Sequence, residues 1–173
     1  MRKYALALTA GTGVPAVQQT IRSAILSAAR NPDPHSLFAA KTADIRHLGD
    51  EPLLAALEHR GYDALVAIED DQFVGFSAFQ KHGNGSEWHG FFHFVPESLQ
   101  GRGVGKDLVR EFIAHARQAG ASIVIVWNGD ERHELPAKHR EAMEHIFSEA
   151  SHNRIGLPFM VHRGTRTGEL LLQ

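Results

Sequence analysis

The chain has 173 residues, of which 43% are hydrophobic and 22% charged, with a formal net charge of −2, so we expect residues 1–173 to form one globular domain. This charge balance lacks the basic excess of nucleic-acid-binding proteins, and the absence of cysteine excludes disulfides and thiolate catalysis. No apolar run is long enough to span a bilayer, and although residues 4–10 leave a signal peptide open, we expect a cytoplasmic protein without a membrane partner.

The first third of the chain predicts a strand and two helices. Residues 4–9 alternate between larger and smaller side chains and precede two glycines, which indicates a strand and a turn. Pro15 can open a helix, and apolar residues continue at helical spacing to about residue 30. Residues 35–48 show no clear pattern. A second helix is predicted over residues 50–60, with a glycine directly after it as its stop.

A three-stranded antiparallel meander follows. Residues 64–68 and 73–79 flank a short polar turn, as in a β-hairpin, and residues 87–95 add the third strand. The next helix, over residues 104–119, carries one continuous apolar stripe and stops at Gly120.

The last third predicts a buried strand, a helix and a hairpin. Residues 123–127 are almost all apolar, which is typical of a strand covered on both faces and parallel to its neighbour. Residues 134–150 predict a helix. Residues 157–161 and 169–172 flank a polar, glycine-containing turn and predict a final pair of strands.

The loop of residues 100–105 reads Gln-Gly-Arg-Gly-Val-Gly and lies between a predicted strand and a predicted helix. Such a loop exposes backbone N–H groups at a helix N-terminus, where anions bind. It is not a Walker loop, because Lys106 is followed by Asp107 instead of Ser or Thr. It is not the dinucleotide fingerprint, because Lys106 and Leu108 occupy the positions of the required third glycine.

The remaining pattern, Gln-x-x-Gly-x-Gly, resembles the acyl-CoA pyrophosphate loop of the GNAT superfamily, whose members are acetyl-CoA-dependent N-acyltransferases with the pattern Arg/Gln-x-x-Gly-x-Gly/Ala. The predicted order of elements is also similar to the GNAT topology over most of residues 2–172. The resemblance implies an α/β fold with a mixed, mostly antiparallel sheet of about seven strands and about four flanking helices. In that family the fourth and fifth strands splay apart.

The resemblance also implies the residues that bind acetyl-CoA, the co-substrate. The pyrophosphate would contact the amides of the loop, which comprises Gln100, Gly101, Arg102, Gly103, Val104, Gly105 and Lys106. Arg102 and Lys106 could add positive charge there, or they could be solvated surface residues. The pantetheine arm would lie between the splayed strands, lined by Phe94, Val95 and Trp127.

A general base is expected on the fourth strand, because the amine must lose a proton before it attacks the thioester. In GNAT enzymes this base often lies eleven residues before the Arg or Gln of the loop, which is His89 here. Alternation of side chains in a strand would place Glu87, His89 and His93 on one face, so His93 could relay the proton. His93 or Glu87 could also replace His89 as base, or both histidines could have only structural roles.

The family's general acid is usually a Tyr near the end of the fourth helix. This sequence has no Tyr in that region, and His152 stands at the matching position. His152 could donate the proton, as could a water molecule, or the reaction could proceed without a general acid.

The twelve histidines do not predict a metal site. His89 and His93 would stand about 13 Å apart on a strand, from four steps of about 3.3 Å each, which is too far to share one ion. We therefore expect no metal.

The leading hypothesis is an N-acetyltransferase that moves an acetyl group from acetyl-CoA to a primary amine by direct attack. The alternative is a catalytically silent GNAT-like domain that binds acyl-CoA as a sensor or regulator. The acceptor could be a small-molecule amine or a protein amine. Asp44, Glu51 and Glu58 weakly suggest a cationic acceptor, although solvated charges explain them equally. A homodimer would be consistent with the family.

Overall fold

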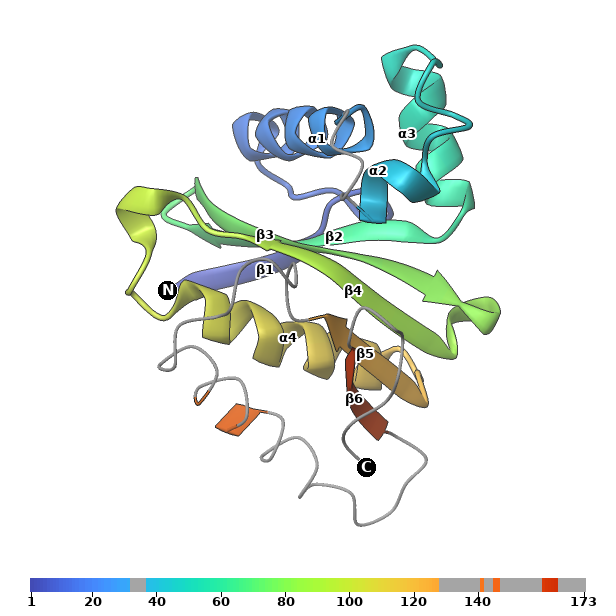
Figure 1. Ribbon diagram of the computed structural model, residues 1–173. Helices are drawn as coiled ribbons and strands as arrows, with labels where there is room; N and C mark the ends of the chain where they lie inside the picture. Colours follow the sequence, from blue (N-terminus) through green and yellow to red (C-terminus); the bar gives the residue numbers. More distant parts are fainter. Residues whose placement is uncertain (32–36, 128–140, 142–144, 147–159, 165–173) are drawn as a thin grey trace.

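The computed structural model describes residues 1–31, 37–127, 141, 145–146 and 160–164, and within them the chain forms one six-stranded sheet in the order β1-β2-β3-β4-β5-β6 (Figure 1). Pairs β1–β2, β2–β3 and β3–β4 are antiparallel, whereas β4–β5 and β5–β6 are parallel. The strands are β1 Arg2–Leu6, β2 Tyr62–Glu69, β3 Gln72–His82, β4 Glu87–Phe94, β5 Ile123–Trp127 and β6 Met160–Gly164. The helices are α1 Pro15–Ala29, α2 Leu37–Lys41, α3 Asp50–His59 and α4 Val104–Gln118, with short 3-10 turns at Gly83–Gly85 and Glu97–Leu99.

The strand count differs from the expected seven. The described residues contain six strands, and the second strand of the predicted final pair, residues 169–172, lies outside them. The first strand of that predicted pair, residues 157–161, corresponds to β6, which covers Met160–Gly164 and pairs in parallel with β5. Of the helix predicted over residues 134–150, only Glu141, His145 and Ile146 are described, and Ile146 is buried in the same cluster as residues of α4.

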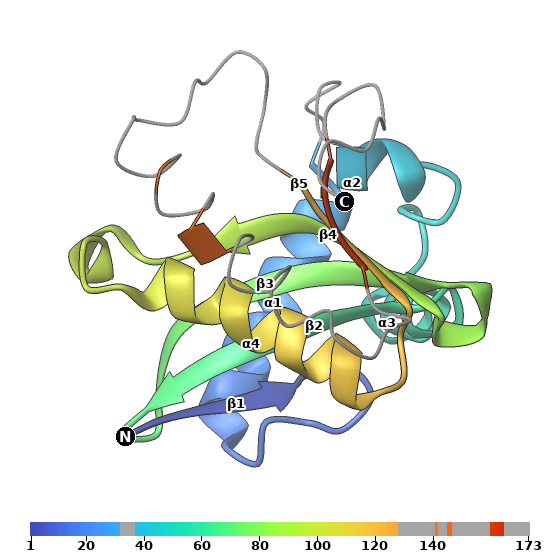
Figure 2. The same ribbon diagram turned by 90° about the horizontal axis from the view of Figure 1, so that it is seen from below.

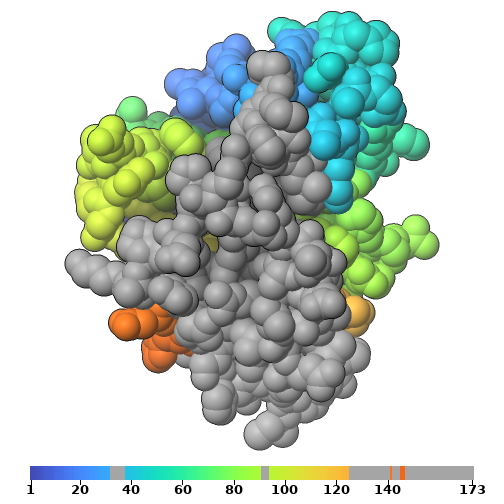
Figure 3. Space-filling model, in the orientation of Figure 1, coloured from blue at the N-terminus to red at the C-terminus, as the bar shows by residue number. Residues whose placement is uncertain are grey.

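Helices cover both faces of the sheet (Figures 1 and 2). α1, α2 and α3 lie on one face, where Ile21, Leu53 and Phe76 belong to one apolar cluster. α4 lies on the other face, where Phe112 packs with Phe79 and Trp88. Figure 3 shows α1 to α3, in blue and cyan, above the green residues of the strands. The sheet thus separates an α1–α3 side from an α4 side.

The boundaries of α4 follow from its flanking glycines. The helix begins after Gly103, which has φ +79°, and Gly120 beyond its end has φ +82°. Its apolar stripe is buried against the sheet, as the sequence predicts. The observed end lies one residue before the predicted one.

The prediction of the first strand was wrong at both ends, since β1 covers Arg2–Leu6 instead of residues 4–9. The reason is the buried carboxylate of Asp63, which accepts hydrogen bonds from the backbone N–H of Leu8 at 2.9 Å and from the hydroxyl of Thr9. These contacts replace strand pairing after Leu6.

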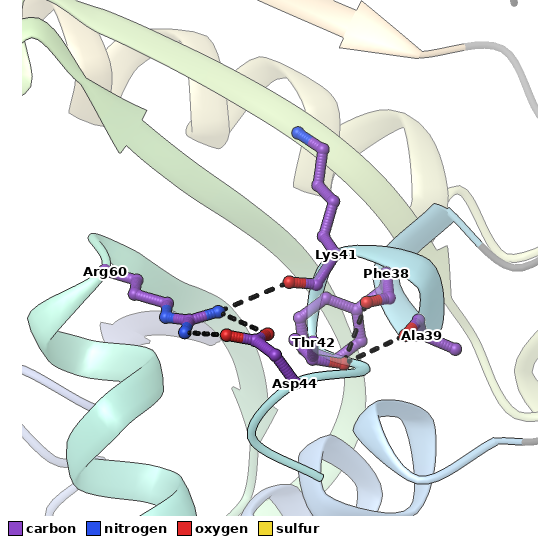
Figure 4. Close-up of polar contacts among 6 residues, drawn as sticks. All are labelled: Phe38, Ala39, Lys41, Thr42, Asp44 and Arg60. Atoms are coloured by element: carbon purple, nitrogen blue, oxygen red, sulfur yellow. Dashed lines mark hydrogen bonds and ion pairs between the residues drawn. The ribbon is translucent and has the colours of Figure 1, made fainter.

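α2 forms within the stretch that showed no pattern. The buried hydroxyl of Thr42 lies 2.9 Å from the carbonyl oxygen of Phe38 (Figure 4). It also lies 3.1 Å from the carbonyl oxygen of Ala29 at the end of α1. A single helical turn is too short to show periodicity, so its sequence does not reveal it. In the described part of the chain, none of the helices combines the length and apolar character needed to cross a membrane.

Candidate functional site

The loop before α4 presents backbone N–H groups without intrahelical partners. The first N–H to bond within the helix is that of Asp107, which donates to the carbonyl of Gly103 at 3.1 Å, and no side chain caps the helix. The N–H groups of Val104, Gly105 and Lys106 precede that bond. Three amides at the positive end of a helix dipole can together bind an anion.

Backbone conformation explains the first two glycines of the loop. Gly101 and Gly103 have φ +78° and +79°, and a Cβ added at either would meet nothing within 4 Å. Glycine is therefore needed at both positions for the left-handed backbone conformation, which other residues rarely adopt, and not for lack of space. Gly105 has an ordinary helical φ, and an added Cβ would make a normal contact with Val95 at 3.9 Å.

The charges around the loop are largely paired. Asp107 in the first turn of α4 forms an ion pair with Arg2 of β1. Arg102 lies 3.8 Å from Glu69, with 58% of its side chain exposed, and Lys106 is exposed. An anion at the loop would therefore meet Lys106 and Arg102, while the carboxylate of Asp107 is neutralised by Arg2.

β4 and β5 pair over only part of their length. Cα partners run from Glu87 and Ile123 to Gly90 and Val126, and β4 then continues to Phe94 beyond this pairing. Trp127, at the end of β5, pairs with β6 instead. The residues after Trp127 that could lie beside the rest of β4 are outside the described part of the chain, so the separation of the fourth and fifth strands stays a prediction.

Two apolar residues lie at the end of β4. The Phe94 side chain is 41% exposed and stacks on Phe73, with ring centroids 6.3 Å apart. Val95 packs against the cluster that contains Val104, the first residue of α4. An added Cβ on Gly75 would lie 2.8 Å from the carbonyl oxygen of Phe94, so this glycine allows β3 to approach the end of β4 closely. The loop and the strand ends are thus held together.

A β-bulge interrupts β4 and corrects the predicted alternation. Gly90 pairs with Phe79 but Phe92 pairs with Ala78, which leaves Phe91 as an extra residue. His89 therefore lies opposite Gln80, and His93 opposite Ser77, an odd number of steps away. Because of this bulge, alternation along β4 is not sufficient to assign His93 to the face of His89, so that assignment stays a prediction.

His89 lies in a cluster of polar side chains near the start of β4. Its Nε2 is 3.1 Å from a carboxylate oxygen of Glu87, and 18% of the His89 side chain is exposed. The His82 ring lies 4.2 Å from the His89 ring, centroid to centroid. Because Trp88 packs on α4, the neighbouring His89 belongs to the face that α1–α3 cover.

His82 and Lys41 belong to the surroundings of His89, and the sequence did not predict either of them there. Burial, then the charges of His89 and Lys41, lower the pKa of His82, against a smaller opposing effect of Glu87. Burial also lowers the pKa of Lys41. The strand register could have identified His82, because it pairs with Glu87 across β3 and β4. Lys41 could not be found because α2 was not predicted.

The acidic residues that suggested a cationic acceptor are mostly paired. Asp44 accepts a hydrogen bond from Arg60 at 3.0 Å, which lowers the pKa of Asp44, and Glu51 pairs with Arg22. Figure 4 shows the Asp44–Arg60 pair, with the Lys41 side chain extending away from it. The suggestion of a cationic acceptor is correspondingly weaker.

Not all predicted site residues can be placed. His152 lies outside the described residues, and for His93 and Trp127 the structure describes only the backbone. The side-chain amide of Gln100 donates a hydrogen bond, 3.3 Å long, to the carbonyl of Val95, which links the loop to the end of β4. Among the described residues, no group of three or more His, Asp or Glu side chains could hold a metal ion.

The sequence profile of the acetyltransferase (GNAT) family matches residues 21–139, which include the glycine loop, β4 and β5. The chain belongs to this family. Its enzyme class is therefore GNAT-type acetyltransferase, and GNAT enzymes use acetyl-CoA. None of the curated proteins matches the sequence significantly.

Solved structures share the GNAT fold at low sequence identity. A GNAT-family protein from Desulfovibrio desulfuricans is 17% identical over 84% of each chain, with a TM-score of 0.52. An aminoglycoside acetyltransferase from an uncultured soil metagenomic sample is 15% identical, covering 83% of this chain and 85% of its own, with a TM-score of 0.51. A second such enzyme, also from an uncultured soil metagenomic sample, is 15% identical over 86% of this chain and 90% of its own, with a TM-score of 0.50.

Proposed function

We propose that this GNAT protein transfers an acetyl group from acetyl-CoA to a primary amine by direct attack, within a single domain of residues 1–173. The observation that carries the proposal is the row of unpaired amides at Val104, Gly105 and Lys106, beside Val95 at the end of β4. The diphosphate of acetyl-CoA needs several backbone donors of this kind. Its pantetheine arm would lie in the predicted gap between β4 and β5.

The residues at the loop and strand ends fit acetyl-CoA. The loop amides up to Lys106 would hold the diphosphate, except that of Gln100, which donates to the carbonyl of Glu97 at 3.1 Å, and Arg102 and Lys106 would add charge. The partly exposed ring of Phe94, together with Val95 and Trp127, would line the pantetheine arm. When bound, acetyl-CoA supplies an activated acetyl group as a thioester.

His89 is the proposed general base. The carboxylate of Glu87 can only accept, so the Nε2 of His89 donates in the 3.1 Å contact between them. Nδ1 then keeps its lone pair and can accept the proton of the amine. Because His89 faces the α1–α3 side, the amine would enter from that side. His93 remains a proposed proton relay and His152 a proposed acid.

The test is the release of CoA thiol from acetyl-CoA in the presence of an amine panel. Polyamines, aminoglycosides, amino acids and a peptide with a free N-terminus cover the acceptor classes. The proposal predicts release that depends on one class of amine and a new amide in that amine. CoA binding without amine-dependent release would instead support the silent acyl-CoA-binding domain.

A further inference from the structure

His82 shares a face of the sheet with His89. His82 pairs with Glu87 across β3 and β4, and His89 pairs with Gln80. The two histidines are therefore diagonal neighbours, at a spacing that aromatic side chains can bridge. Their rings lie 4.2 Å apart between centroids, tilted by 38°.

Together, two side chains restrict the His89 ring. Glu87 holds Nε2 at one edge, at 3.1 Å. The His82 ring covers the imidazole at van der Waals distance. Rotation of the His89 ring would break its contact with Glu87 and separate it from the His82 ring. The ring is therefore held in one orientation only while both neighbours are present.

His82 is suited to packing and not to proton transfer. Its Nε2 is buried and has no hydrogen-bond partner. A protonated ring would bury an N–H donor without an acceptor, which is unfavourable. The charged groups that face it are His89, Lys41 and Glu87, and the first two oppose its protonation. The neutral form of His82 is therefore favoured more than in an exposed histidine, which makes His82 a poorer acceptor for the proton of the amine.

We infer that His82 is a positioning residue, whose ring packs on that of His89 and, together with Glu87, keeps Nδ1 of His89 available to the acceptor. The inference rests on the proposed function for the role of His89. It assigns to His82 an effect on proton transfer and none on acetyl-CoA binding.

The first test observes the free protein. ¹⁵N spectra of histidine side chains, recorded above the imidazole titration range, distinguish the two neutral tautomers. Wild type and His82→Phe should show His89 with the proton on Nε2, because Phe keeps the ring contact. His82→Ala should show a mixture of tautomers. The control His59→Ala, at an exposed position of α3, should match wild type.

The second test is kinetic, with the amine that supports thiol release. His82→Ala should lower kcat roughly tenfold without raising KM for acetyl-CoA, and His82→Phe should recover most of the loss. An unchanged His89 tautomer in His82→Ala, or a Phe variant no better than Ala, would overturn the inference. If wild type releases no thiol with any amine while the tautomers behave as expected, the proposed function fails and the positioning contact stands.

Discussion

At the scale of single residues, the contact between His89 and Glu87 determines which nitrogen can act. Counting eleven positions back from the loop predicts His89 as the base from the sequence, but the tautomer follows only from the 3.1 Å contact in the structure. The same counting could not foresee the bulge at Phe91, because one extra strand residue leaves no mark in composition or spacing. The relation between His89 and His93 was therefore not predictable.

Replacing His89 by Gln tests the base directly. Loss of a positioned general base should lower kcat by about 100-fold or more, while acetyl-CoA binding should be unchanged because the loop is intact. Steady-state kinetics and a binding titration measure the two effects. The control is His59→Gln, which should retain wild-type turnover; unchanged turnover in His89→Gln would reject the assignment.

The lowered pKa of His82 predicts a dependence of stability on pH. Because the folded state resists protonation of His82 and the unfolded state does not, the unfolded state binds more protons at acid pH. His82 thus contributes stability fully above the ordinary imidazole pKa of about 6.5, and this is lost as the pH falls through the lower folded value. Melting temperatures at neutral and acid pH should differ less in His82→Phe than in wild type. An equal difference in both proteins would contradict this.

At the scale of elements, the turn into α4 is the part of the site that the sequence predicts best. Gly103 and Gly120 bound an apolar stripe, and both signals are local, so the helix and its free amides can be expected without tertiary information. α2 shows the opposite case. Its position depends on Thr42, which bonds to the end of α1, thirteen residues earlier in the chain. Such a contact cannot be read from periodicity.

Two glycine variants separate conformation from helix preference in this element. Gly103→Ala forces a Cβ into the left-handed conformation at φ +79° and should lower the free energy of unfolding by about 1–2 kcal/mol, measured in urea. It should also weaken CoA binding, because the amides after it shift. Gly105→Ala is the matched control, since its Cβ has room at 3.9 Å from Val95. Its stability and CoA binding should match wild type; equal losses in both variants would contradict the assignment.

At the scale of the whole molecule, the sheet divides the site between its two faces. α4 brings the anion-binding turn from one side, while His89, His82 and α2 lie on the other. The pairing of Asp44 with Arg60 and of Glu51 with Arg22 was not predictable, because these residues lie 16 and 29 positions apart. Two of the three acidic residues that suggested a cationic acceptor from the sequence, Asp44 and Glu51, are thus paired within the fold.

Coenzyme A should stabilise the fold, because it binds the assembled turn and strand ends and not the unfolded chain. At about 100 times its dissociation constant, CoA should add about 2.7 kcal/mol to the free energy of unfolding. Thermal melts with increasing CoA measure this effect. A melting temperature that does not depend on CoA concentration would contradict it.

The central claim is that the free amides at the start of α4 bind a diphosphate, and calorimetric titration tests it most directly. The wild-type protein is titrated with CoA and, separately, with pantetheine, which lacks the diphosphate and the nucleotide. Each hydrogen bond to a charged group contributes about 1.5–3 kcal/mol, so we predict measurable heat with CoA and binding at least about 100-fold weaker with pantetheine. No heat with CoA, or equal affinity for both ligands, would contradict the account.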